Sequence, residues 1–365
     1  MLQSSKSLRM DSESIKLVGD LLKRNEDNIL VQVTEVTKAI SADEKQAALL
    51  KDFIPDILRL TSSQNKDVAK NAVITLINMT SNVPSVIDKL IELKAVTRLT
   101  DAVISPEPTF VHERLMLLSN LTTQKSGVLQ LLDLQDKELK GQRLLRLAVR
   151  FTTPPESTSI PQAVPLRGLN LIAESPNDEY EYAAMVLMNA TLMPEARSII
   201  YASPEFFMPT LLDAMSGDNP IRKQGIIGVI RNLCFDQKQH EYLIKKGNIL
   251  PYLIKPLISK TIEDNLTAAE MLHKSFPTIV FGDPEPIPEN RFHILETLLL
   301  LTQSECGKSS LTGSNLVFVL RELDDYETEE ENKNLGLRIT AALLGPGEEK
   351  EKVEAPNAEI GRASC

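Results

Sequence analysis

The fold class is decided by the stretch Arg222-Lys-Gln-Gly-Ile-Ile-Gly-Val-Ile-Arg-Asn-Leu-Cys-Phe235. It is an apolar helical run that ends in Asn232, one apolar residue and a small residue, Cys234. Three other runs end in the same way, with Asn78, Asn120 and Asn189 in place of Asn232 and Thr in place of Cys. A helix ending that recurs along a chain indicates a series of structural repeats.

The spacing of these four asparagines indicates the class of repeat. Asn78 to Asn120 is 42 residues, Asn120 to Asn189 is 69, and Asn189 to Asn232 is 43. Armadillo and HEAT repeats have a period of roughly 40–47 residues, and two of the three intervals match it. The interval from Asn120 to Asn189 exceeds the period by about 27 residues, which predicts an insertion or an irregular repeat. We therefore expect an all-α fold, an armadillo/HEAT-type helical repeat superhelix (solenoid).

Shorter helices are predicted between these endings. The apolar spacing of 86–95 is that of one helix face, and a second helix follows over 96–104. Three further segments start alike, each with Pro at the third position. Proline costs no intrahelical hydrogen bond in the first turn of a helix, so we expect these prolines there. The segments are Phe53–Leu60, Phe207–Ala214 and Ile249–Leu257, with Pro55, Pro209 and Pro251.

Composition shifts predict the domain layout. Residues 1–9 are polar and are expected to be a flexible N-terminus, followed by one repeat domain over 10–345. Prolines predict an irregular loop or insertion at about 151–178 and a loop at about 282–288, ahead of a helix over 291–302. The segment 346–365 is rich in Glu and Lys without apolar periodicity, so we expect a disordered charged tail.

Charge and cysteine usage narrow the class of partner and the compartment. Forty Lys and Arg stand against 50 Asp and Glu, a net charge of −10, which argues against nucleic acid as the main partner. Cys234, Cys306 and Cys365 have no CxxC spacing, which favours a reducing compartment. Without a visible signal peptide or membrane-spanning run, we expect a cytoplasmic protein that could also be nuclear.

The sequence shows no catalytic constellation. Cys306-Gly-Lys-Ser-Ser310 resembles the end of a phosphate-binding loop, but Thr302 stands where that motif needs its first glycine. The four histidines have no metal-ligand spacing, and no nucleophile elbow or dinucleotide-binding glycine pattern is present. We expect no enzyme activity, no cofactor and no metal.

The recurring asparagines are candidate protein-binding residues. In an armadillo stack, Asn78, Asn120, Asn189 and Asn232 would place amides near the inner, concave face, where an amide can bond a partner's extended backbone. The alternative is that each Asn closes its helix or ties adjacent repeats together. The preferred contact patch surrounds Asn232, since charged and polar residues gather there; its other members are Arg222, Arg231, His240 and Glu241. The alternative for the patch is a plain solvated helix face.

The same region resembles the HGH-one homolog family of eukaryotic armadillo-like proteins. The resemblance rests on an Arg-Asn-x-Cys-Phe ending, a following His-Glu pair and the run 249–257; the matching residues are Gly225, Gly228, Arg231, Asn232, Cys234, Phe235, His240 and Glu241. It extends over roughly 45–345, with departures at 324–326, in the loop 260–288 and at Ala196.

The resemblance implies a chaperone adaptor that helps newly made elongation factor two to fold with the TRiC/CCT chaperonin. Such an adaptor needs no ATP site, because the chaperonin supplies the energy. The alternative is another armadillo-type scaffold or transport adaptor with a different client. Transport receptors usually grip basic peptides with Trp-Asn pairs, and this chain has no Trp.

Overall fold

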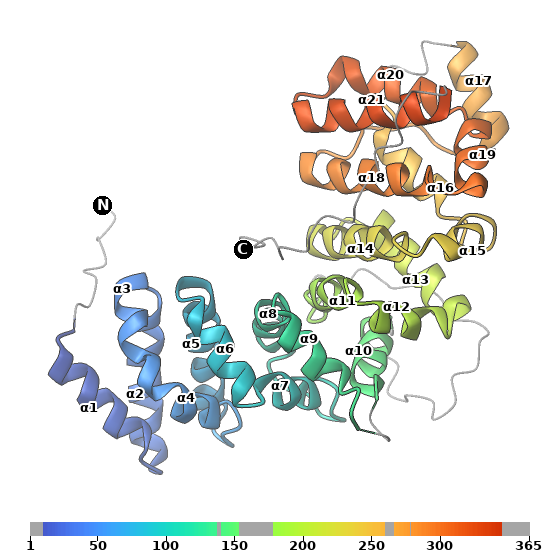
Figure 1. Ribbon diagram of the computed structural model, residues 1–365. Coiled ribbons are helices and arrows are strands. Elements are labelled where there is room, and N and C mark those ends of the chain that lie inside the picture. Colours follow the sequence, from blue (N-terminus) through green and yellow to red (C-terminus); the bar gives the residue numbers. More distant parts are fainter. Residues whose placement is uncertain (1–9, 137–139, 153–177, 260–265, 278, 345–365) are drawn as a thin grey trace. The chain divides into compact units, whose positions relative to one another are not determined.

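The computed structural model describes residues 10–136, 140–152, 178–259, 266–277 and 279–344 (Figure 1). Over these residues the chain forms α-helices and short 3-10 helices and no strand, which confirms the all-α prediction. The predicted flexible N-terminus, the charged tail and most of the predicted insertion at 151–178 lie outside the described residues. None of the described helices has the length and apolar character needed to cross a membrane.

The chain divides into two compact units. Among the described residues, the first comprises those up to 151 together with 178–190. Its helices are α1 (Ser12–Leu22), α2 (Asp27–Ser41), α3 (Glu44–Ala47), η1 (Ala48–Phe53), α4 (Ile54–Leu60), α5 (Lys66–Asn82), α6 (Ser85–Glu92), α7 (Ala95–Val103), α8 (Val111–Thr122), α9 (Lys125–Leu132), α10 (Gln142–Thr152) and α11 (Ala183–Thr191), of which α10 and α11 each end on a residue of the second unit.

The second unit comprises the described residues from 191 to 344. Its helices are α12 (Pro194–Tyr201), α13 (Pro204–Ser216), α14 (Pro220–Leu233), η2 (Gln237–Gln239), α15 (His240–Lys245), α16 (Leu250–Ile254), η3 (Lys255–Leu257), α17 (Leu266–Ser275), α18 (Pro288–Leu301), α19 (Glu305–Gly313), α20 (Leu316–Tyr326) and α21 (Glu330–Leu344).

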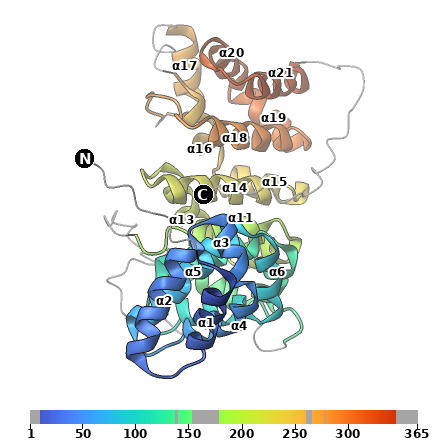
Figure 2. The ribbon, with the colours of Figure 1, turned by 90° about the vertical axis from the view of Figure 1, so that its left-hand side faces the viewer.

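Within each unit the long helices pack on one another in successive layers. In the first unit α5 packs between α2 and α8, and in the second α18 packs between α14 and α21 (Figures 1 and 2). The shorter helices fill the interval from one long helix to the next, as predicted. Their interior is almost entirely aliphatic; Leu76, Leu118 and Leu298 are fully buried. Each such side chain contributes roughly 1.5–3 kcal/mol by leaving water, so aliphatic side chains hold the layers together with few aromatics, Phe151 and Phe207 among them.

Glycine permits the tightest turn from a long helix into the short helix that follows. A Cβ on Gly307 would lie 2.0 Å from the carbonyl oxygen of Leu301, and one on Gly127 would lie 2.2 Å from that of Leu121. Ser304 caps α19 by accepting a hydrogen bond of 3.1 Å from the Gly307 amide. The backbones therefore approach more closely than any residue with a side chain allows.

The proline positions are confirmed at two of three sites. Pro55 and Pro251 lie in the first turns of α4 and α16. Pro209 was predicted to start a helix but lies inside α13, because Pro204 already occupies the first turn, five residues earlier. Pro288 likewise starts α18 ahead of the expected residue 291, so the preceding loop ends at Ile287.

A buried ion pair stabilises the last repeat. Arg291 of α18 donates two hydrogen bonds of 2.7 Å to the Glu327 carboxylate, whose side chain is fully buried. Asn332 of α21 donates a third, of 2.9 Å. Burial alone would raise the pKa of Glu327, but these donors and the Glu329 amide outweigh it and lower that pKa to about 2.

Candidate protein-binding surface

The four candidate asparagines have one structural role in common. Each donates a hydrogen bond from its side-chain amide to a residue near the end of the preceding long helix, at 2.9–3.2 Å. The pairs are Asn78 with the Ser41 hydroxyl, Asn120 with the Thr80 hydroxyl, Asn189 with the Thr122 hydroxyl and the Ser119 carbonyl, and Asn232 with the Thr191 hydroxyl.

The donor and acceptor of this link sit two residues apart in each repeat. Thr80 accepts from Asn120, and Asn78 on the same helix donates to the previous one. The Thr80 hydroxyl donates its own proton to the carbonyls of Leu76 and Ile77 in the same helix, at 2.9 and 2.8 Å. A lone pair on its oxygen therefore remains to accept the bond from the Asn120 amide. The series ends at Cys234, which stands in the threonine position, because a thiol is a weak acceptor.

These bonds favour the second of the two interpretations made from the sequence. The amides of the four asparagines tie adjacent repeats together, and each uses at least one N–H for this link. Asn232 is 1 % exposed and Asn189 is 8 % exposed, while Asn78 and Asn120 are half-buried. Only Asn78 and Asn120 present an appreciable area to a partner.

Arg231 belongs to a joint between α14 and α18. Its Nε lies 2.6 Å from the Glu296 carboxylate, and its guanidinium lies 5.3 Å from the centre of the Phe235 ring. Arg197 approaches the same ring at 5.8 Å and forms a bidentate pair with Asp236. Burial would raise the pKa of Glu296, but hydrogen bonds from His293 and Arg231 hold it below the ordinary value. The charge of Arg231 is thus largely neutralised within the chain.

His240 is a buried connector. It has no exposed area, and its two ring nitrogens contact the Cys234 carbonyl at 2.7 Å and the Ser304 hydroxyl at 2.9 Å. A carbonyl can only accept, so Nε2 carries the proton and, in the neutral ring, Nδ1 accepts from Ser304. Burial lowers the pKa of His240, which favours that neutral form. The ring joins the end of α14 to the cap of α19.

The predicted contact patch is therefore corrected in part. His240, Asn232 and Arg222, which is 7 % exposed, lie too deep to meet a partner. Glu241 remains on the surface with 67 % of its side chain exposed, in a pair of 2.7 Å with Lys245. The sequence did not show that most of these residues point inward, because their partners lie far away in the chain; Glu296, for example, lies 65 residues from Arg231.

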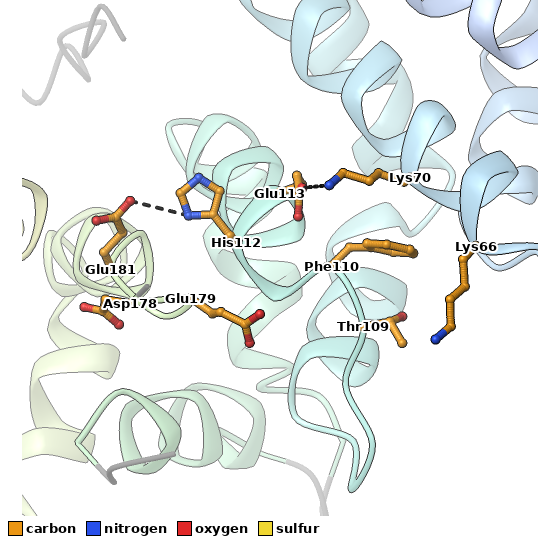
Figure 3. Close-up of a pocket in the computed structure, with 9 residues that line it drawn as sticks. All are labelled: Lys66, Lys70, Thr109, Phe110, His112, Glu113, Asp178, Glu179 and Glu181. Atoms are coloured by element: carbon orange, nitrogen blue, oxygen red, sulfur yellow. Dashed lines mark ion pairs between the residues drawn. The ribbon is translucent and has the colours of Figure 1, made fainter. Parts of the chain in front are cut away.

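A charged groove that the sequence did not indicate lies in the first unit (Figure 3). It has a volume of about 640 Å³ and is formed by the N-terminal parts of α5 and α8 and the segment before α11. Its nine lining residues are Lys66, Lys70, Thr109, Phe110, His112, Glu113, Asp178, Glu179 and Glu181. They come from three separate segments, so no local spacing could have flagged them.

Two ion pairs cross the groove. Lys70 of α5 lies 3.0 Å from Glu113 of α8, and His112 lies 3.4 Å from Glu181 (Figure 3). Both pairs are partly exposed, so each contributes little to stability. Charged side chains in an open groove are instead available to exchange partners.

Phe110 lies beside the Lys70–Glu113 pair in an unusual backbone conformation (Figure 3). Its φ is 51°, in the left-handed region, which costs roughly 1–2 kcal/mol for a residue with a side chain. It occupies the position just before α8 and contributes its ring to the groove wall. Strain of this kind accumulates at functional sites more than elsewhere.

No group of three or more His, Cys, Asp or Glu side chains with metal-binding geometry occurs in the described part of the chain. The segment that resembled a phosphate loop, Cys306–Ser310, lies within α19. Its backbone amides are therefore engaged in a helix and do not form a phosphate cradle.

Comparison with known proteins shows which proteins this chain is similar to. A family model described as "Domain of unknown function (DUF383)" matches residues 102–274. "Protein HGH1 homolog" of Dictyostelium discoideum is 26% identical over 311 residues, covering 84% of this chain and 83% of that protein. "Protein HGH1 homolog" of Danio rerio is 26% identical over 302 residues, covering 80% of this chain and 73% of that protein. Over most of its length the chain is similar to HGH1 homologs. The predicted resemblance is thereby confirmed.

A solved structure supports the repeat class. A designed armadillo repeat protein in complex with the peptide (KR)4 superposes with a TM-score of 0.55 at 13% identity, covering 80% of this chain and 99% of that one. At that identity the likeness concerns the fold alone. The predicted armadillo-type helical repeat fold is confirmed.

Proposed function

We propose that this chain is a non-catalytic, protein-binding adaptor that assists folding of newly made elongation factor two with the TRiC/CCT chaperonin in the cytoplasm. The observation that carries the proposal is the similarity to HGH1 homologs over most of the chain. Client and chaperonin are the partners that this similarity suggests.

The physical character of the chain fits an adaptor. Helical repeats present extended surfaces that can follow an incompletely folded polypeptide over many residues. The one sequence segment that resembled a nucleotide site lies within a helix. An adaptor of this kind leaves ATP hydrolysis to the chaperonin. The partly exposed Asn78 and Asn120, with the charged groove, provide polar and charged contacts in the first unit.

Affinity purification from a cell extract tests the proposal. The tagged full-length chain is purified soon after a pulse of isotope-labelled amino acids, and the bound proteins are identified by mass spectrometry. We expect labelled, newly made elongation factor two together with TRiC/CCT subunits, above a control with a tagged armadillo protein of another family. Clean absence of both would refute the proposal.

A different armadillo-type scaffold or transport adaptor is the second candidate, because the fold alone serves both roles. It would recover another reproducible client, whose level stays the same after protein synthesis is blocked. A folding adaptor would instead lose its client on that treatment.

A further inference from the structure

The α5 side of the groove carries an excess of positive charge. Lys66 and Lys70 project from the N-terminal part of α5, where the helix dipole adds partial positive charge (Figure 3). Arg114 of α8 lies behind them against Phe110, with its guanidinium 6.0 Å from the ring centre. Lys70 Nζ lies at the same distance from that ring. Glu113 is the carboxylate that pairs with Lys70 and lies near Arg114.

Arg114 is unusual for a buried cation. It is 7 % exposed, donates one hydrogen bond of 3.0 Å to the Thr61 carbonyl, and keeps a buried Nε without a hydrogen-bond partner. It forms no ion pair with any described residue. An arginine stays charged even when burial lowers its pKa, as it does here. Its charge therefore adds to the positive potential next to Phe110 and the two lysines.

The opposite side of the groove is acidic. Asp178, Glu179 and Glu181 line it, with His112 as the basic residue that contacts Glu181. A long polyanion such as nucleic acid would meet these carboxylates and be repelled. A single carboxylate on the α5 side would escape this repulsion, particularly if the residues after it are neutral or basic.

We propose that this groove docks an extended segment of a partner protein through one acidic side chain, which pairs with Lys70, while Lys66 on the other side of Phe110 adds positive potential (Figure 3). Lys70 exchanges its partly exposed pair with Glu113 for the incoming carboxylate, at modest cost because such pairs are weak. Phe110 offers an apolar surface to the neighbouring residue of the segment. The inference rests on one part of the proposed function, namely that the chain binds other polypeptides.

A peptide-display selection tests this without any assumption about the client. A random octapeptide library on phage is panned against the full-length chain, against the variant K66E/K70E, and against a matched control, K23E/K89E. The control makes the same change in net charge at two exposed lysines elsewhere in the first unit. One selected peptide and its Glu→Gln or Asp→Asn counterpart are then synthesised, and binding is measured by fluorescence anisotropy.

We expect enrichment of peptides with a single acidic residue, and a Kd that rises about tenfold both in K66E/K70E and in the amide counterpart of the peptide. K23E/K89E should bind as the wild type does. Peptides without acidic bias, polyacidic peptides, or binding insensitive to K66E/K70E would overturn the inference. Circular dichroism verifies that the variants fold. Because no cell extract is used, this outcome is separate from recovery of elongation factor two.

Discussion

The Asn120 amide and the Thr80 hydroxyl satisfy each other at the ends of two neighbouring helices. One side chain supplies the donor and the other the acceptor, so neither polar group is left unpaired where the layers meet. A net contribution of about 1 kcal/mol is typical of such a bond, whereas an unpaired buried group costs about 1–3 kcal/mol. The interaction is therefore measurable at a single position.

We expect N120A to lower the free energy of unfolding by about 1 kcal/mol, because the Thr80 hydroxyl loses its donor. The variant T80V removes the acceptor, and the double variant N120A/T80V should be less destabilised than the sum of the two. Urea unfolding of the four proteins gives the coupling energy, which we expect at roughly 0.5–1.5 kcal/mol. Strict additivity would show that the two residues do not interact in solution.

At the scale of elements, the close packing of a short helix on the preceding long helix depends on a turn in which only glycine fits. Gly307 in α19 meets the Leu301 carbonyl, whereas Gly313, at the end of the same helix, has no atom within 4 Å of the place that an alanine methyl group would take. The two glycines share a helix and differ in what surrounds them. They form a matched pair for measuring how much the close approach matters.

We expect G307A to destabilise the protein by about 2 kcal/mol or more, because α19 must move away from α18 to make room for the methyl group. G313A should be neutral or slightly stabilising, because alanine favours helix and meets no neighbour. Thermal unfolding followed by circular dichroism compares the two. Equal melting temperatures for both variants would contradict the packing described for the turn.

Features that depend on residues within one helix were predicted correctly. They are the helices that carry Asn78, Asn120 and Asn189 and the first-turn positions of Pro55 and Pro251. The roles that depend on distant partners were not visible in the pattern. His240 meets Ser304, 64 residues further on, and the groove combines helix starts that are far apart in the chain. The burial of the predicted patch could not be read from charge alone.

At the scale of the whole molecule, the response to acid depends on which of the 50 acidic residues resist protonation. Glu327 is the clearest case, with its pKa lowered to about 2 by Arg291, the Glu329 amide and Asn332 against the opposing effect of burial. A carboxyl group whose pKa is lowered on folding stabilises the native state fully above its ordinary pKa. That contribution is lost as the pH falls from about 4.5 towards 2.

We expect E327Q to lower the free energy of unfolding by about 3 kcal/mol at pH 7, because the buried Arg291 loses its counter-charge. The deficit should shrink steadily below pH 4.5, since the wild type then loses the same charge by protonation. Urea unfolding at neutral pH and at several steps down to about pH 3 measures the difference. A deficit that is constant over this range would mean that Glu327 is not ionised in the native state.

The asparagine link has a consequence for how such a chain could have grown. Each layer from Asn78 to Thr191 brings a donor for the layer behind it and an acceptor for the layer ahead. A duplicated segment would thus carry both the Asn donor and the Thr acceptor of the link. Deleting a segment would leave a donor and an acceptor that can still bond each other. Ala39 precedes the first acceptor, Ser41, and Cys234 follows the last donor. Ala39 and Cys234 therefore mark the two ends of the run of asparagine links, because each stands where half of the link is missing.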